Sequence, residues 1–156
     1  MIMKPRRKPD DVWSKFALSI FKLNGLIMQA GDDITLPIGQ SSARWQVLAR
    51  AFEPQTVAQM ARDMGHARQG VQRVADILVK EGLVVYREHP TDRRTQLLEL
   101  TPKGLEVLTI IYLRQVDWSE QIMTKLKPEQ LAMVSAALEE IGQILETELN
   151  KNDKGD

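Results

Sequence analysis

The chain has 156 residues, of which 43% are hydrophobic and 27% are charged, an ordinary composition for a globular protein. It contains no cysteine, which excludes disulfides, thiolate nucleophiles, iron–sulfur clusters and sensors that work by cysteine oxidation. The 21 basic and 21 acidic residues cancel, but residues 62–103 carry eight basic and six acidic groups, and residues 104–156 carry five and ten. A basic middle beside an acidic end favours one face that binds a polyanion and another that avoids it.

The sequence contains no apolar run of the roughly 18 residues that a membrane span needs. Residues 16–28 are fairly apolar, but Lys22 and Asn24 interrupt them, which is atypical of a secretory signal. The lack of cysteine fits a reducing compartment. We therefore expect a cytoplasmic protein with no membrane partner.

The first half of the chain is predicted to be helical. Apolar residues recur at helical spacing over 12–30, and Gly31-Asp32-Asp33 should end that helix. Residues 36–39 are predicted to be a connector. Ser41 or Ser42 should then cap a second helix that continues to about Phe52.

The segment 56–83 has the pattern of a helix-turn-helix. Thr56 and Gln59 form a capping-box pattern before a short helix that ends at Gly65. A second helix is predicted over 67–80, with one narrow apolar stripe formed by Val71, Val74, Ala75 and Leu78. In a helix-turn-helix that binds DNA, the second helix enters the major groove.

Four polar residues face outward near the start of this second helix when its apolar stripe faces the core: Arg68, Gln69, Gln72 and Arg73. Arginine can contact O6 and N7 of guanine, and glutamine can contact N6 and N7 of adenine. We assign the four residues to base edges and phosphates of the major groove. An ordinary solvated helix face has the same residue types, so the helix alone leaves both interpretations open.

A hairpin follows the helix-turn-helix. Residues 83–87 and 95–100 are strand-like, and the polar segment 88–94 forms the tip between them. A narrow minor groove attracts inserted arginine, and a carboxylate can hold an arginine in one rotamer. We therefore assign Arg94 to the minor groove, Asp92 to orienting it, and Arg87 and Arg93 to phosphates. The alternative is a mobile surface hairpin with a local ion pair.

Two long helices complete the predicted elements. Thr101-Pro102 should open the first, which continues to about Leu126, because proline is favoured at the first helical position. Lys127-Pro128-Glu129 separates it from a last helix that continues to about Leu149.

From the second helix of the helix-turn-helix onward, the sequence resembles the MarR family of winged-helix transcription regulators, named after multiple antibiotic resistance. The resemblance rests on the residues Leu78-Val79, Gly82-Leu83-Val84, Asp92-Arg93-Arg94, Thr101 and Gly104. By the order and length of the flanking helices it covers nearly the whole chain. Two positions depart from the family pattern: Gly70-Val71, where a small or polar residue followed by Leu, Ile or Ala is usual, and His66-Ala67, where a serine cap is common.

The resemblance implies a mostly α fold with a two- or three-stranded β wing. Residues 1–40 would form an N-terminal arm and dimerisation helix, residues 41–101 the winged helix-turn-helix, and residues 102–156 the C-terminal dimerisation helices. It also implies a homodimer that binds a pseudo-palindromic site in double-stranded DNA, with the recognition helices about 34 Å apart. The long helices support dimerisation independently, because one chain has too few other elements to cover their large apolar residues, among them Ile110, Ile111, Leu113, Leu138, Ile141 and Leu145.

The resemblance further implies a repressor that a small aromatic or phenolic ligand releases from DNA. The expected pocket is lined by Trp13, Phe16, Met28, Trp45, Tyr112 and Trp118. The alternative interpretation is that aromatic and methionine residues at helical spacing belong to the core.

Enzyme chemistry has little support in the sequence. His66 and His89 do not lie in a cluster with metal-ligand spacing, and no G-x-S-x-G, glycine-rich phosphate loop or H-E-x-x-H occurs. We expect no enzyme activity, metal or cofactor. Two other hypotheses remain: a winged helix that docks a protein rather than DNA, and an architectural DNA-binding protein that responds to no ligand.

Overall fold

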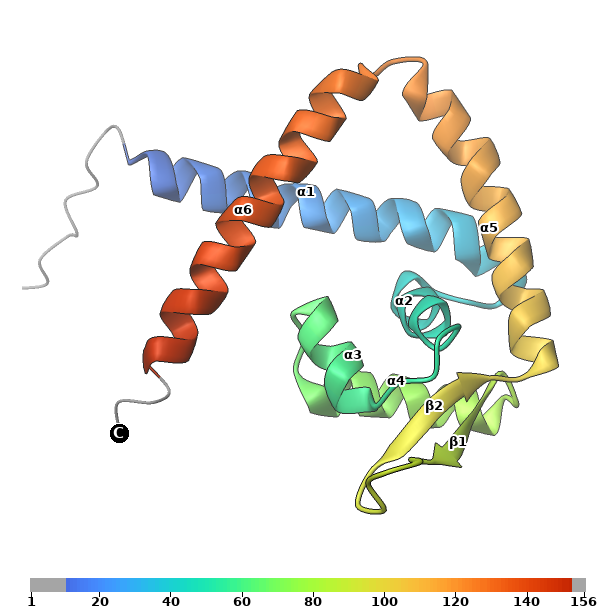
Figure 1. The fold of residues 1–156 in the computed structure, drawn as a ribbon. Coiled ribbons are helices and arrows are strands. Elements are labelled where there is room, and N and C mark those ends of the chain that lie inside the picture. Colours follow the sequence, from blue (N-terminus) through green and yellow to red (C-terminus); the bar gives the residue numbers. More distant parts are fainter. Residues whose placement is uncertain (1–10, 153–156) are drawn as a thin grey trace, which may run out of the picture. The chain divides into compact units, whose positions relative to one another are not determined.

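A computed structural model describes residues 11–152, so residues 1–10 of the expected N-terminal arm lie outside the described part. Six α-helices, one short 3₁₀ helix and two strands follow in chain order (Figure 1). Their bounds are α1 Val12–Thr35, η1 Leu36–Ile38, α2 Ser42–Arg50, α3 Val57–Met64, α4 Arg68–Lys80, β1 Val84–Glu88, β2 Gln96–Leu100, α5 Pro102–Met123 and α6 Pro128–Asn152. The expected mostly helical fold with a small β wing is confirmed.

The chain divides within α5 into two compact units, Met1–Arg114 and Gln115–Asp156. The first unit contains the core. It is built by the end of α1, helices α2, α3 and α4, the two strands and the first half of α5. Its largest fully buried side chains include Leu48, Met60, Leu78, Leu98 and Ile111. In the second unit, none of the described side chains of α6 is buried.

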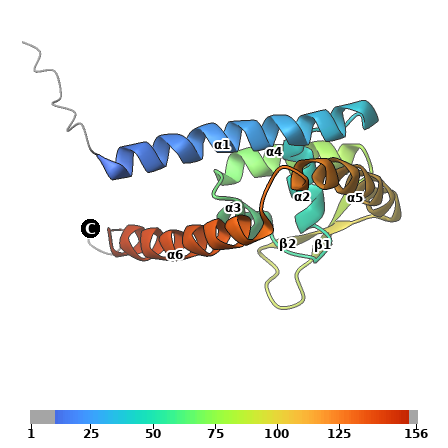
Figure 2. The ribbon, with the colours of Figure 1, turned by 90° about the horizontal axis from the view of Figure 1, so that it is seen from above.

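The two strands form an antiparallel hairpin, and one face of the hairpin packs on the core. In its register, Val84 lies opposite Leu100, Tyr86 opposite Leu98, and Arg87 opposite Leu97. The expected wing had two or three strands. In place of a third strand, one isolated bridge is present, in which Gln55 and Leu98 exchange backbone hydrogen bonds of 3.4 and 2.8 Å. The tip of this wing projects away from α2, α3 and α4 in both views (Figures 1 and 2).

The prediction that Gly31-Asp32-Asp33 ends the first helix is wrong, because α1 continues to Thr35. The N-terminus of α2 packs against this stretch: the Ser42 amide donates to Asp32 Oδ1 at 2.7 Å, and a Cβ at Gly31 would lie 2.5 Å from Ser42 Oγ. A larger residue at position 31 would collide with Ser42, so the close packing here favours a glycine although glycine costs helix propensity. The helix ends instead before Pro37, which cannot continue its hydrogen bonding.

Polar side chains begin the helices much as the sequence predicts. Ser41, Thr56 and Thr101 accept hydrogen bonds from the amides of Arg44, Gln59 and Gly104, respectively. The capping box at Thr56 is only half formed. The Gln59 side chain does not reach back to Thr56 but bonds to Arg62 and Asp63 on its own helix.

Candidate nucleic-acid interface

The turn between α3 and α4 sets the angle of the second helix of the helix-turn-helix. Gly65 adopts a left-handed conformation with φ of 63°, and the His66 amide donates to the carbonyl of Ala61 at 2.9 Å. Glycine is favoured at this position after a helix because a side chain would strain it. From this turn α4 packs against α2, α3 and β1.

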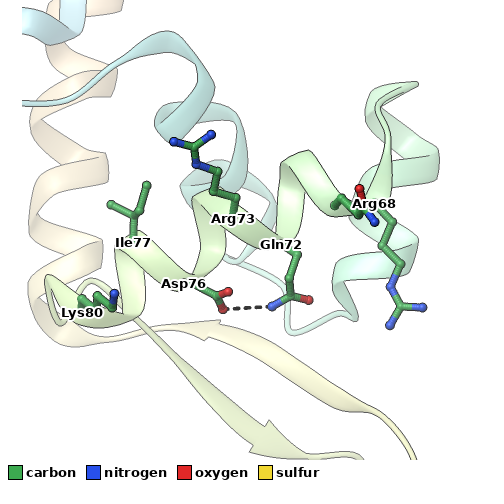
Figure 3. A pocket seen from close by; sticks show the side chains of 7 residues that line it. Arg68, Gln72, Arg73, Asp76, Ile77 and Lys80 are labelled. Carbon is green, nitrogen blue, oxygen red and sulfur yellow. Dashed lines mark hydrogen bonds between the residues drawn. The ribbon is translucent and has the colours of Figure 1, made fainter.

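Helix α4 has one buried and one exposed face. Of the predicted apolar stripe, Val71, Ala75 and Leu78 are buried in the core, and Val74 is partly buried against it. The other face borders an open groove along the helix (Figure 3), and the groove is lined by Arg68, Gln69, Gln72, Arg73, Asp76, Ile77 and Lys80. The structure therefore brings the four residues predicted from this helix together on one surface with net positive charge.

The four predicted residues differ in how free their side chains are. Within residues 11–152, the side chains of Arg68, Gln69 and Arg73 make no hydrogen bond or ion pair. Gln72 is engaged: its Nε2 donates to Asp76 Oδ1 at 2.9 Å and to the Tyr86 hydroxyl of β1 at 2.6 Å. Three side chains are thus available to a ligand, while the fourth is held in place.

Asp76 and Tyr86 complete a polar cluster that the sequence analysis missed. The Tyr86 hydroxyl donates to Asp76 Oδ1 at 3.0 Å. Burial, reinforced by the hydrogen bond and negative charge of Asp76, raises the pKa of Tyr86 to about 12, so the phenol stays protonated at neutral pH. The spacing of four residues from Gln72 to Asp76 is a recognisable helix pair. No sequence pattern marks the contact with Tyr86.

The tip of the wing is built around two acceptors. The amides of Thr91 and Asp92 both donate to His89 Nδ1, at 3.2 and 3.0 Å. The Asp92 carboxylate in turn accepts the backbone amide of Arg94 at 3.0 Å and its Nε at 3.2 Å. These hydrogen bonds lower the pKa of Asp92 below its ordinary value. The bond from the backbone amide contributes most, and the bond from the Arg94 side chain comes next. The tip is therefore a defined turn held by local hydrogen bonds.

The three arginines of the wing differ in exposure and partners. The side chain of Arg94 is 91% exposed although Asp92 holds its Nε. Arg93 and Arg94 line a second groove at the tip, together with Glu88, His89, Thr95 and Gln96. Arg87 lies farther back on β1, where its Nε is 3.4 Å from Glu99 Oε2.

The six residues expected to line a ligand pocket are spread over several elements. Trp13 and Phe16 lie on α1 with ring centroids 5.7 Å apart. Met28 lies where α1 packs on α2, with Gln46 Nε2 3.1 Å from its sulfur, and Trp45 on α2 packs against the core. Tyr112 is exposed on α5, and Trp118 belongs to the second unit. The grooves along α4 and at the wing tip contain none of the six.

The described residues give no indication of a metal or membrane site. Between residues 11 and 152, no three His, Asp or Glu side chains gather as a metal-binding group. No helix in the same range is both long enough and apolar enough to cross a membrane.

Comparison with known proteins places this architecture. The sequence profile of the MarR family matches residues 46–95, which include α3, α4, β1 and the tip of the wing. The uncharacterized protein Rv2011c of Mycobacterium tuberculosis is 36% identical over 122 residues, which cover 78% of this chain and 85% of that protein. The chain belongs to the MarR family.

Solved MarR-family structures share the fold. AbsC, a MarR family transcriptional regulator from Streptomyces coelicolor, superposes with a TM-score of 0.75 at 18% identity, over 90% of this chain and 99% of its own. Staphylococcus aureus MarR in complex with salicylate and kanamycin gives a TM-score of 0.72 at 18% identity, over 88% and 94%. MarR-family proteins are transcription regulators rather than enzymes, and this chain is a DNA-binding regulator of that family.

Proposed function

We propose that this MarR-family chain is a homodimeric repressor that binds a pseudo-palindromic site in double-stranded DNA and leaves it when a small aromatic or phenolic ligand binds. The observation that carries the proposal is the pairing of two surfaces. The exposed face of α4 presents free arginine and glutamine side chains, and the wing beside it presents Arg93 and Arg94.

The exposed face of α4 fits the major groove. Arg68, Gln69 and Arg73 have unoccupied donors, which suit the O6 and N7 atoms of guanine and the phosphate oxygens. Asp76 is the one acidic residue of the groove, and the Gln72 amide and the Tyr86 hydroxyl both donate to it. These hydrogen bonds reduce the tendency of its carboxylate to repel a phosphate.

The wing fits the minor groove and its phosphates. We propose that Arg94 enters the minor groove, that Asp92 orients it, and that Arg93 and Arg87 contact phosphates. The bond from Arg94 Nε to Asp92 leaves the terminal nitrogens of the guanidinium for DNA. Arg87 would reach a phosphate by exchanging its exposed partner Glu99, an ion pair that contributes little in water.

Exposed apolar side chains on the long helices support dimerisation. Phe21 on α1 is 71% exposed and Met133 on α6 is 72% exposed, and both helices carry further exposed leucine and isoleucine residues. Many exposed large apolar side chains on one helix are typical of an interaction site, and each of the two helices has them. We propose that residues 1–40 and 102–156 cover these faces in a second copy, while residues 41–101 bind DNA.

The ligand proposal rests on the family. Salicylate, a small phenolic compound, is bound in the related S. aureus structure. In this chain Trp13, Phe16, Met28, Trp45, Tyr112 and Trp118 are the proposed lining. A ligand that binds better to a DNA-free arrangement of the two recognition helices would release the operator by shifting that equilibrium. We propose that the protein works where its DNA partner lies, in the cytoplasm.

One experiment tests the core of the proposal: selection of duplexes from random sequence by the purified protein, followed by titration of the selected duplex at several salt concentrations. We expect two half-sites related by a two-fold axis and an affinity that falls steeply with salt, because bound phosphates release counterions. No duplex selected, or a flat salt response, would favour a winged helix that docks a protein. Phenolic compounds that neither stabilise the protein nor release DNA would favour a ligand-independent DNA-binding protein.

A further inference from the structure

The side chains of Gln72, Asp76 and Tyr86 form a closed triangle of hydrogen bonds beside the groove of α4. Gln72 Nε2 lies 2.9 Å from Asp76 Oδ1 and 2.6 Å from the Tyr86 hydroxyl, and that hydroxyl lies 3.0 Å from Asp76 Oδ1. The triangle joins the middle of α4 to the second residue after the start of β1, 14 positions further along the chain.

The chemistry of the triangle fixes which way the Gln72 amide faces. An ionised aspartate only accepts hydrogen bonds, so the group that faces Asp76 must be the NH₂ of Gln72. The Tyr86 hydroxyl donates its one hydrogen bond to Asp76, and the raised pKa of the phenol, about 12, keeps the proton on Tyr86. The phenol oxygen therefore accepts from Gln72 as well, and both amide hydrogens have an acceptor at hand.

The amide oxygen of Gln72 is left on the open side of the groove. Figure 3 shows the nitrogen of Gln72 directed at Asp76 and the oxygen pointing away from it. Oε1 makes no hydrogen bond to any residue in the described range 11–152. This unpaired oxygen is not among the buried side-chain atoms of the described residues, so it is accessible to a ligand, while the two hydrogen bonds of Nε2 hold the side chain in place.

We propose, building on the DNA-binding function above, that Gln72 presents only an acceptor to the major groove and reads the exocyclic amino group of adenine or cytosine. In the major groove the N6 group of adenine and the N4 group of cytosine are donors, whereas guanine offers O6 and N7 and thymine offers O4, which are acceptors. Gln72 thus distinguishes amino bases from keto bases at one position of each half-site.

This assignment differs from the contact expected from the sequence, in which one glutamine bridges N6 and N7 of adenine. That bridge needs a free amide hydrogen for N7, and Asp76 and Tyr86 occupy both hydrogens. Tyr86 acts as a positioning residue: it does not contact the base, but it removes the donor that would separate adenine from cytosine.

The test measures the affinity of the wild-type protein for the selected duplex with each of the four bases in turn at every half-site position. At one position we expect adenine and cytosine to bind equally well, and guanine and thymine about ten-fold more weakly. In Gln72→Ala the four bases should become equivalent at that position alone. Gln69→Ala, which removes a neighbouring DNA-facing side chain without partners, is the matched control: it should lower the overall affinity but leave the preference at that position intact.

Tyr86→Phe supplies a second readout that a merely structural role would not produce. The variant frees one hydrogen of Gln72, so adenine should gain about five-fold over cytosine at the same position, the worth of one added hydrogen bond. In the free protein, the side-chain NH₂ signals of Gln72 should be shifted and slow to exchange, unlike those of Gln69, and should lose part of this protection in Tyr86→Phe. Nuclear magnetic resonance measures this without DNA and also checks the fold of the variant.

The outcomes separate this inference from the proposed function. If the wild-type protein selects no duplex, both are wrong. If it binds a selected duplex but Gln72→Ala leaves every base preference unchanged, or if the wild-type protein accepts adenine and rejects cytosine at the Gln72 position, only the acceptor-only readout is wrong. Gln72 amide signals that match those of Gln69 in the free protein would also overturn it.

Discussion

Gly104, in the first turn of α5, lies so close to Leu83 that a Cβ on Gly104 would be 1.9 Å from the Leu83 carbonyl oxygen. The same oxygen accepts the amide of Thr101 at 3.1 Å, and the Thr101 hydroxyl donates to the carbonyl of Gly82 at 2.6 Å. The loop between α4 and β1 and the start of α5 are thus locked together. This junction sets where the wing begins relative to the recognition helix.

Gly104→Ala should therefore destabilise the protein. The added methyl group meets backbone rather than a flexible side chain, so the junction must shift. We expect the free energy of unfolding to fall by about 3 kcal/mol, the upper part of the range for overpacking. Urea denaturation followed by circular dichroism measures the change.

Gly70→Ala is the matched control for that variant. Gly70 also lies in a helix, but nothing is within 4 Å of its Cβ position, and its φ is not positive. Alanine should raise the free energy of unfolding by about 0.5–1 kcal/mol, because glycine costs helix propensity. Equal effects of the two substitutions would contradict the close packing at Gly104.

Ala67→Ser should stabilise the recognition helix. Ala67 is the residue before α4, with φ of −64° and ψ of 134°, and it offers no side-chain cap to the helix. A serine hydroxyl there can accept an unpaired amide of the first turn, which is worth about 1 kcal/mol. The same denaturation measurement tests this, and a loss of stability would show that the backbone at Ala67 cannot adopt a capping geometry.

Arg94→Ala should weaken DNA binding without affecting folding or dimerisation. The side chain is 91% exposed, so its removal leaves no cavity, but it takes one cation from the minor groove. We expect about ten-fold lower affinity at fixed salt and a smaller salt dependence. Lys151→Ala, which removes the same charge from α6, should change neither; wild-type affinity for Arg94→Ala would refute the role given to the wing.

The pKa of Asp92 should lie below 3.8, its ordinary value, in the folded protein. Because the folded value is depressed, the contribution of Asp92 to the order of the wing tip is complete above the unfolded pKa and is lost as the pH falls through the folded pKa. The backbone amide of residue 94 is the largest cause. Arg94→Ala should therefore retain most of the shift, which a carboxyl-carbon magnetic resonance titration can measure. An ordinary pKa in that variant would assign the shift to the guanidinium instead.

Leu145→Glu should weaken the proposed homodimer. Leu145 is 40% exposed on α6, and a buried carboxylate at a dimer interface would be desolvated without a partner. Sedimentation at several concentrations should show a shift toward monomer. Gln143→Glu adds the same charge two residues away, on a different face of the helix, and should leave the dimer intact. Identical sedimentation of both variants would place the interface elsewhere.

The sequence by itself determined the local features of this protein. The spacing of Val71, Ala75 and Leu78 gave the buried face of α4, and Thr56 and Gly65 marked the two ends of α3. These features can be predicted from a short stretch of sequence, because helix periodicity, helix caps and left-handed glycines depend on residues only three or four positions away. The outward placement of Arg68, Gln69 and Arg73 followed from the same periodicity.

The tertiary structure alone decided the features that depend on residues far apart in the chain. Helix α1 continues through Gly31, where Ser42 packs closely against it. The Gln72 oxygen faces outward because Asp76 and Tyr86, the latter on a strand 14 residues later, each take one of its amide hydrogens. An apolar pattern specifies which face is buried but not which polar atom meets which partner. Those pairings depend on how closely the elements pack. A difference of a few tenths of an ångström in their separation decides whether a hydrogen bond forms.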